Sequence, residues 1–258
     1  MRYRPLGRTG EQVSVVSLGS GGPRRLGQDR GASIDEMAAL VRTACELGIN
    51  LFDTAPAYGD SEEILGHALR GVDRSTYLLA TKVTVTTDGR LHDAKEVDSS
   101  VTRSLRRLGT DHVDIVQLHG VRPEHYRDAV DRLLPVLDVR RVSGDLRFIG
   151  LTEAPRHDPD HTMLAMALDD GRFDTVMVEY NLGAPGAQDV VFPPAIAAGA
   201  GVIVMKAVTP EVLRRSPAAA AYRFAAAHPA VATVLTGTAD PGHLAENVAA
   251  VLGDPGAA

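Results

Sequence analysis

Four residues whose side chains can hold or move a proton fall at the ends of three consecutive apolar segments. Asp53 and Tyr58 lie five residues apart around one turn, in the stretch Phe52-Asp53-Thr54-Ala55-Pro56-Ala57-Tyr58-Gly59. Lys82 and His119 end the next two apolar segments. A carboxylate, a phenol, an ammonium and an imidazole on one rim would form a proton-delivery site with a tunable pKa. Reduction of a carbonyl requires such a site.

The chemistry of these groups predicts a role for each. Tyrosine has an ordinary pKa near 10 and is a poor acid at neutral pH. A nearby ammonium stabilises the phenolate, so we expect Lys82 to lower the pKa of Tyr58. Asp53 would keep Lys82 charged, a neutral His119 would orient the carbonyl oxygen, and Tyr58 would protonate the developing alkoxide. No side chain supplies a hydride, so a nicotinamide cofactor is implied.

Each of these residues also has an ordinary structural explanation. Asp53 can cap a turn, Tyr58 can pack in a loop, and His119 can be a hydrogen-bonded core histidine. Lys82 is harder to explain in this way, because a lysine between leucine, alanine and valine residues needs a buried partner. Only three of the 27 basic residues are lysines. A lysine where arginine is the default suggests that a compact, titratable ammonium is required.

Composition bounds the class of protein. The chain has 258 residues, 44% of them hydrophobic and 23% charged, which suits one globular domain over residues 1–258. A net charge of −6 disfavours a nucleic-acid partner. The single cysteine, Cys45, forms no internal disulfide, which favours a reducing compartment. We find neither a signal peptide nor a membrane-spanning segment, so we predict a cytoplasmic location. The oligomeric state is not determined.

The elements that must position the four groups alternate between strand and helix along the chain. Predicted strands cover residues 13–19, 50–53, 77–83, 112–119, 146–151, 175–180, 201–205 and 231–235. Predicted helices cover residues 34–47, 62–69, 94–108, 127–142, 162–168, 192–198, 218–227 and 243–252. Strands that are apolar on both faces are typical of a parallel sheet covered by helices.

Eight such units in this length favour a closed (β/α)₈ TIM barrel, whose active site lies at the carboxyl ends of the strands. The alternative is an open doubly wound sheet, which usually has a Gly-x-Gly-x-x-Gly loop after its first strand. Here Gly19-Ser20-Gly21-Gly22-Pro23 lacks that spacing. The segment 3–11 is expected to form a short N-terminal hairpin that closes the barrel floor. The tail 253–258 is expected to be frayed.

These residues together resemble the aldo-keto reductase family over almost the whole chain. The similar motifs are Phe52 to Gly59, Ala80-Thr81-Lys82-Val83, Val116-Gln117-Leu118-His119, Phe148-Ile149-Gly150-Leu151-Thr152, and Thr236-Gly237-Thr238 with Leu244-Ala245-Glu246-Asn247. The resemblance implies the barrel, the catalytic tetrad Asp53, Tyr58, Lys82 and His119, and no metal. It implies NADP(H) as a more frequent cofactor than NAD(H). The implied cofactor contacts are Ser20, Asp53, Thr152, Glu153, Met177, Met205, Lys206, Thr236, Gly237, Thr238, His243, Glu246 and Asn247.

The chain departs from the family where the nicotinamide would lie. Thr152 and Glu153 replace a Ser-Asn pair that holds the nicotinamide amide, and Met177 replaces a glutamine. Glu153 would add a negative charge beside the ring, or point away from it. Met205 replaces a stacked aromatic, and a thioether can still pack against a ring. Lys206, next in the chain, is expected to contact the pyrophosphate.

The resemblance is also weaker where the 2′-phosphate would lie. His243 replaces an arginine and Gly237 a lysine. A neutral histidine holds a phosphate less well than a bidentate arginine. NADP(H) over NAD(H) therefore stays an expectation based on the family.

We predict NAD(P)H-dependent reduction of an aldehyde or ketone, or the reverse oxidation of an alcohol, on a small-molecule substrate. One alternative is a nucleotide-binding regulatory or redox-neutral member of the family. Another is an aldolase-like enzyme in which Lys82 or Lys206 forms a Schiff base. The sequence determines neither the substrate nor the physiological direction.

Overall fold

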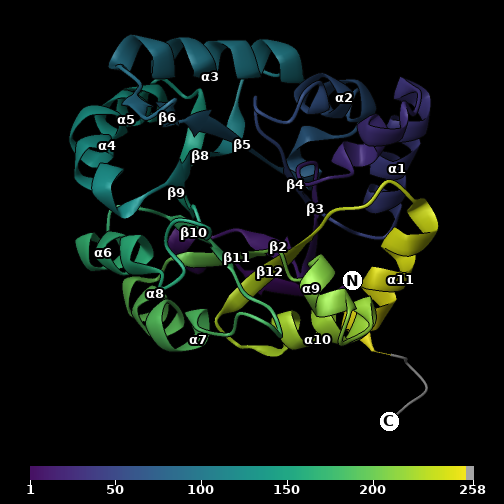
Figure 1. Cartoon of the computed structure of the whole chain (residues 1–258). Coiled ribbons are helices and arrows are strands. Elements are labelled where there is room, and N and C mark those ends of the chain that lie inside the picture. Colours follow the sequence, from purple (N-terminus) through teal and green to yellow (C-terminus); the bar gives the residue numbers. More distant parts are fainter. Residues whose placement is uncertain (254–258) are drawn as a thin grey trace.

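The computed structural model describes residues 1–253, and the predicted frayed tail lies almost wholly outside them. Eight parallel strands close into a barrel in the order β10-β11-β12-β3-β4-β5-β8-β9, and helices surround it (Figure 1). The barrel strands are β3 (Val16–Gly19), β4 (Leu51–Asp53), β5 (Leu78–Thr84), β8 (Val113–Val121), β9 (Leu146–Glu153), β10 (Thr175–Glu179), β11 (Gly201–Met205) and β12 (Val231–Thr236). The predicted (β/α)₈ barrel is confirmed, and the open sheet is excluded.

The α-helices follow the predicted order with two short additions, α7 and α9. They are α1 (Ile34–Glu46), α2 (Ser61–Ala68), α3 (Ala94–Leu108), α4 (Tyr126–Arg132), α5 (Leu134–Val142), α6 (Thr162–Asp170), α7 (Ala187–Val190), α8 (Phe192–Ala198), α9 (Pro210–Leu213), α10 (Ala218–Ala227) and α11 (Pro241–Leu252). The 3₁₀ turns are η1 (Gly7–Thr9), η2 (Arg25–Arg30), η3 (Arg74–Thr76) and η4 (Pro123–His125). None of the helices in residues 1–253 is both long and apolar enough to cross a bilayer.

Local signals set where several helices begin and end. Ser33 caps α1 and forms a capping box with Glu36, which satisfies amides of the first turn. The helix predicted over 127–142 is instead divided into α4 and α5. The physical reason is Pro135, in the first turn of α5, because proline has no N–H to continue the hydrogen-bond ladder of α4.

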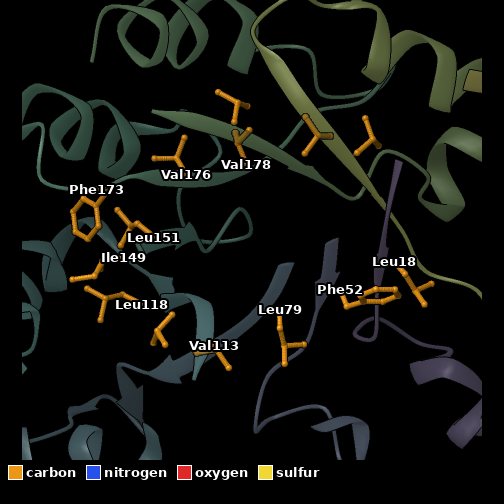
Figure 2. Close-up of a cluster of buried hydrophobic side chains, with 14 of the residues drawn as sticks. Leu18, Phe52, Leu79, Val113, Leu118, Ile149, Leu151, Phe173, Val176 and Val178 are labelled. Carbon is orange, nitrogen blue, oxygen red and sulfur yellow. The ribbon is translucent and has the colours of Figure 1, made fainter. Parts of the chain in front are cut away.

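Side chains alternate between the inside of the barrel and the helices that cover it. Figure 2 shows the outer set, which includes Leu18, Phe52, Leu79, Leu151 and Val176. The inner set is a separate cluster that includes Leu51, Leu78, Ala80, Ile115, Met177 and Ile203. Because the period of a strand is two residues, polar residues two positions beyond inner residues also face inward, at the carboxyl ends of the strands.

The barrel floor is closed by the N-terminal hairpin, as predicted. Strand β1 (Tyr3–Pro5) pairs antiparallel with β2 (Gln12–Ser14), so the hairpin extends further than the expected 3–11. The expected strand 13–19 is correspondingly divided between β2 and β3. Leu6 belongs to the inner cluster, and a Cβ on Gly7 (φ +56°) would lie 2.3 Å from the Gly201 nitrogen. Glycine is required there because the two backbones touch.

A second hairpin, β6 (Thr86–Thr87) with β7 (Arg90–Leu91), follows β5.

Candidate active site

A buried ion pair lies at the centre of the barrel mouth. Asp53 ends β4 and pairs with Ala80 on the neighbouring strand β5. Lys82 lies two residues after Ala80 on β5, which is the next position that faces inward. Lys82 Nζ lies 2.5 Å from Asp53 Oδ2 and donates a second hydrogen bond of 2.8 Å to the Thr54 carbonyl. Lys82 is 1% exposed and Asp53 is 3% exposed. The lysine therefore has the buried partner that its apolar strand requires.

Tyr58 and His119 lie above this pair and are partly exposed. Lys82 Nζ lies 4.9 Å from the centre of the Tyr58 ring, and the Tyr58 hydroxyl lies 3.4 Å from His119 Nε2. The two rings meet edge to face, with centroids 5.6 Å apart. The four residues that the sequence proposes as a tetrad thus come together, with the phenol and the imidazole on the outer side.

Gln117 is a fifth member of this cluster that sequence reasoning missed. It is fully buried and donates a 2.9 Å hydrogen bond from Nε2 to Asp53 Oδ1. Each oxygen of the Asp53 carboxylate therefore has its own donor. Gln117 lies two residues before His119 on β8, so the strand period alone places it on the same inward face. The sequence did contain a signal for this residue, namely a polar side chain at an inward-facing position of an apolar strand.

Burial and charge act in opposite directions on the pKa values of Lys82 and Tyr58. Burial lowers the pKa of Lys82, but Asp53 and Tyr58 raise it, and the result lies above 10.5. Burial raises the pKa of Tyr58 above 10, and the opposing effect of Lys82 is too small to reverse this. The expected lowering by Lys82 is therefore present but outweighed, because removal from water disfavours the phenolate. Tyr58 is held protonated, the state that a general acid needs.

His119 is neutral at physiological pH. Burial, and then the positive charge of Lys82, lower its pKa from 6.5 to about 3. A neutral imidazole can hydrogen-bond a carbonyl oxygen without giving up a proton to it. This is the state in which the sequence-based hypothesis requires His119.

The low pKa of His119 predicts a pH-dependent cost to stability. Between pH 6.5 and about 3 the unfolded state binds a proton at His119 that the folded state does not. Through this group, the free energy of unfolding therefore decreases as the pH is lowered. We expect His119→Gln to be relatively more stable at pH 4.5 than at pH 7.5, when each pH is compared with wild type by urea denaturation. A difference between the two proteins that does not change with pH would contradict the assignment.

The opposite side of the barrel mouth is mainly apolar. Met177 on β10 belongs to the inner cluster, and Met205 on β11 packs partly buried against it. Thr152 on β9 pairs with Met177, and its Oγ1 accepts a 2.7 Å hydrogen bond from the Gly120 amide. Among residues 1–253 the Thr152 hydroxyl has no acceptor for its own proton, so it can donate that proton to a ligand. Two thioethers across the barrel from β4 and β5, and one hydroxyl beside β8, would suit a flat ring with a single polar substituent.

The structure does not bring Glu153 to this mouth. Glu153 is the next residue after the inward Thr152 and lies on the outer side of β9, 2% exposed. Its Oε2 lies 2.7 Å from Nδ1 of His161, the residue before α6, and its Oε1 accepts a 2.7 Å bond from the Glu179 amide. Of the two sequence-based possibilities, the side chain points away from the ring position. Burial raises the pKa of Glu153, while the bond to His161 opposes that rise.

Lys206 follows β11 with a left-handed backbone, at φ +56°. Its ammonium lies 3.6 Å from Glu179 Oε2, and its carbonyl accepts a 3.0 Å bond from Asn181 Nδ2. The side chain is 41% exposed. Lys206 is thus a rim cation held by one partly exposed carboxylate, within reach of solvent.

The segment from β12 to α11 holds the remaining predicted contacts. Thr236 is buried, and its hydroxyl is shared by the Tyr222 hydroxyl at 2.8 Å and by Asn247 Nδ2 at 2.9 Å. Asn247 therefore fixes α11 to the end of β12. The Thr238 hydroxyl accepts a 3.1 Å bond from the Asp240 amide. Of the predicted contacts in this segment, Gly237, His243 and Glu246 are exposed.

Two features of the barrel mouth bear on the binding of a dinucleotide. Ser20, at the exit of β3, is buried, and its hydroxyl has no hydrogen-bond partner in residues 1–253. Gly237 lies beside this exit, where an added Cβ would be 3.7 Å from the Gly21 carbonyl. The loops after the last barrel strands are a frequent phosphate site in such barrels. The backbone amides of Gly242 and His243 already donate to Asp240 Oδ1, so they are not available to bind a phosphate. Exposed side chains would have to bind it instead. No group of three or more metal-ligating side chains occurs within the described residues.

Two curated proteins similar to this chain are named as oxidoreductases. L-galactose dehydrogenase of Arabidopsis thaliana is 39% identical over 60% of this chain and 49% of its own length. The NADH-specific methylglyoxal reductase of Escherichia coli is 30% identical over 70% of this chain and 60% of its own. The chain thus spans less than two thirds of the length of these curated relatives.

The fold comparison covers nearly the whole chain. An aldo-keto reductase from Bacillus halodurans, solved in its holo form, superposes with a TM-score of 0.82 and 25% identity, over 99% of this chain and 92% of that one. A model of the aldo/keto reductase family matches residues 17–216. The chain belongs to the aldo/keto reductase family.

Proposed function

We propose that this protein is an NAD(P)H-dependent oxidoreductase that reduces an aldehyde or ketone, or oxidises the corresponding alcohol. The observation that carries the proposal is a protonated phenol, Tyr58, beside a neutral imidazole, His119, over the buried Lys82–Asp53 pair. We propose a small carbonyl compound as its substrate. The E. coli relative supports this, because its name identifies it as a reductase of methylglyoxal, a small carbonyl compound. A cytoplasmic location stays a prediction.

The nicotinamide cofactor supplies the hydride when it is bound. His119 Nε2 and the Tyr58 hydroxyl, 3.4 Å apart, then hold the carbonyl oxygen between them. Tyr58 gives its proton to that oxygen as the alkoxide forms, and Lys82 stabilises the phenolate left behind. Asp53 keeps Lys82 charged. Water restores the proton of Tyr58, so the step consumes one hydride and one proton per alcohol formed.

The same geometry argues against Schiff-base chemistry. A Schiff base requires an unprotonated amine that a carbonyl can reach. Lys82 is 1% exposed, makes hydrogen bonds to Asp53 and Thr54, and has a raised pKa. The second candidate is instead a nucleotide-binding role with little turnover. Two observations favour it: Met177 is apolar, and Glu153 points away from the barrel mouth toward His161. Of these three residues, only Thr152 could then hydrogen-bond the carboxamide of the nicotinamide.

Cofactor binding and cofactor oxidation separate these candidates. The experiment titrates NADPH and NADH by nicotinamide fluorescence and then follows absorbance at 340 nm with a panel of aldehydes and ketones. An oxidoreductase binds the dinucleotide and oxidises it with at least one carbonyl compound. Tight binding without turnover across the panel would favour the regulatory candidate, and absence of binding would refute both.

We also propose that NADP(H) is preferred over NAD(H). Support comes from two exposed basic residues beside the β12–α11 segment, His243 on α11 and Arg30, whose Nη2 donates a 2.8 Å bond to the Ala239 carbonyl. A 2′-phosphate adds charge that such groups attract.

His243→Arg should strengthen this preference, because a guanidinium is always charged and binds phosphate in bidentate fashion. We expect the dissociation constant for NADPH to fall roughly threefold or more, on the scale of an exposed ion pair. The dissociation constant for NADH serves as the control and should stay within twofold of wild type. Equal changes for both cofactors, measured in the same fluorescence titration, would place His243 away from the phosphate.

A further inference from the structure

The segment after β3, residues 21–30, packs over the loop that carries Tyr58. That loop joins β4 to α2 and includes Gly59 and Asp60, and α2 begins at Ser61. The contacts involve both the backbone and the ring of Tyr58. Nothing in the motifs of the sequence indicates this, since the two segments lie some thirty residues apart.

Gln28 is the main point of contact with the backbone. Its Nε2 donates to the Tyr58 carbonyl at 3.2 Å and to Ser61 Oγ at 2.9 Å. Its Oε1 accepts from the Asp60 amide at 3.0 Å. One half-buried side chain thus bonds to polar groups of Tyr58, Asp60 and Ser61. At Gly59 (φ +65°), an added Cβ would lie 2.5 Å from Gln28 Oε1, so any other residue would displace the Gln28 amide and would adopt a strained backbone.

Gly21 makes the contact with the ring. A Cβ built on Gly21 would lie 2.7 Å from both Cε2 and Cζ of Tyr58. The backbone of the segment therefore lies directly against the phenol, next to the carbon that bears its hydroxyl. The ring is held between this backbone, the Lys82 ammonium at 4.9 Å and the His119 ring.

The segment itself is held in a strained form. Arg25 and Leu26 both have positive φ, at +41° and +61°. Non-glycine residues adopt this conformation only where the surroundings over-determine it, and such strain is concentrated at functional sites. The anchors are Leu26, which is 2% exposed in the core, and Arg30, which bonds to the Ala239 carbonyl at 2.8 Å. The position of Gln28 is therefore fixed from both sides.

We propose that Gln28 is a positioning residue for Tyr58: it fixes the Tyr58 loop so that the phenol stays against Gly21 and in line with His119. The proposal rests on the proposed reductase function for its kinetic consequence but not for its geometry. The hydrogen bonds of the Gln28 side chain do not involve Lys82 or Asp53, so we expect its removal to leave the buried ion pair intact. Its effect falls on proton delivery rather than on cofactor binding.

Gln28→Met tests this, because it keeps the length of the side chain and removes all of its hydrogen bonds. We expect kcat for carbonyl reduction to fall about tenfold, since small misplacements of a reacting group are costly. The dissociation constant for NADPH should stay within twofold. Gln28→Glu keeps the acceptor for the Asp60 amide and loses the donors, and it should also lower kcat. The control is Gln12→Met, at the exposed first residue of strand β2, which should match wild type.

A second measurement does not depend on activity. The six tyrosines are replaced by 3-fluorotyrosine, and the Tyr58 resonance is the ¹⁹F signal that Tyr58→Phe lacks. In Gln28→Met this signal should shift or broaden while the other five stay in place, and Gln28→Glu serves if the first variant does not fold. An unmoved Tyr58 signal, or an unchanged kcat in an active enzyme, would overturn the proposal. A wild-type protein without any turnover would refute the reductase function, and the ¹⁹F comparison would still decide on Gln28.

Discussion

Tyr58→Phe should lower kcat for carbonyl reduction by roughly 10²–10⁴-fold, the usual contribution of a positioned general acid. The substitution removes the hydroxyl that lies 3.4 Å from His119 Nε2 and leaves the ring against Gly21. Because the ring stays, we expect the fold and the dissociation constant for NADPH to change little. The measurement is the rate of NADPH oxidation with the best carbonyl substrate at saturating cofactor.

The control for this variant is Tyr77→Phe, since Tyr77 lies just before β5 on the outer side of the barrel, where its ring packs against Phe52. That substitution should leave kcat within twofold of wild type. If Tyr58→Phe retained full activity, the proton would have to come from another group, and the role given to Tyr58 would be wrong. If both variants lost activity, the loss would reflect stability and not proton delivery.

Lys82→Met should destabilise the fold by about 3–5 kcal/mol, because it leaves the Asp53 carboxylate buried without its counter-ion. It should also abolish turnover, since no ammonium would stabilise the phenolate of Tyr58. The raised pKa of Lys82 means that the contribution of the pair is fully present below pH 10.5 and is lost only as pH rises through the folded value. Urea denaturation at pH 7 therefore measures all of it.

Two further variants make this prediction specific. Lys95→Met removes an exposed lysine from α3 and should change the free energy of unfolding by less than about 0.5 kcal/mol. Adding Asp53→Asn to Lys82→Met removes the unpaired charge and should restore most of the lost stability without restoring turnover. A double variant as unstable as Lys82→Met alone would show that packing, and not the buried charge, is responsible.

Several features of the fold and site were predictable because their causes are local. The capping box at Ser33 and the end of α3 at Gly109 depend on residues within one turn of helix. Eight apolar strands alternating with amphipathic helices predict the barrel. Once the barrel is known, Asp53, Lys82 and His119 at successive strand ends must meet at one rim. The split between α4 and α5 was missed although its cause, Pro135, is also local.

Other features depended on which distant segments pack together. The sequence indicates that Lys82 acts on Tyr58, but the net pKa depends on how much protein covers the phenol, and burial proved larger. Glu153 could face the cofactor or the helices, and the position of His161 before α6 decided it. The contact of Gln28 with the Tyr58 loop joins segments with no shared motif.

The sequence by itself thus determined the architecture and the chemical groups of the site, because periodicity, caps and strand-end residues act over a few positions. The tertiary structure alone decided their protonation, their orientation and their supports. Desolvation and long-range hydrogen bonds depend on the three-dimensional neighbours of a group, which the order of residues does not state.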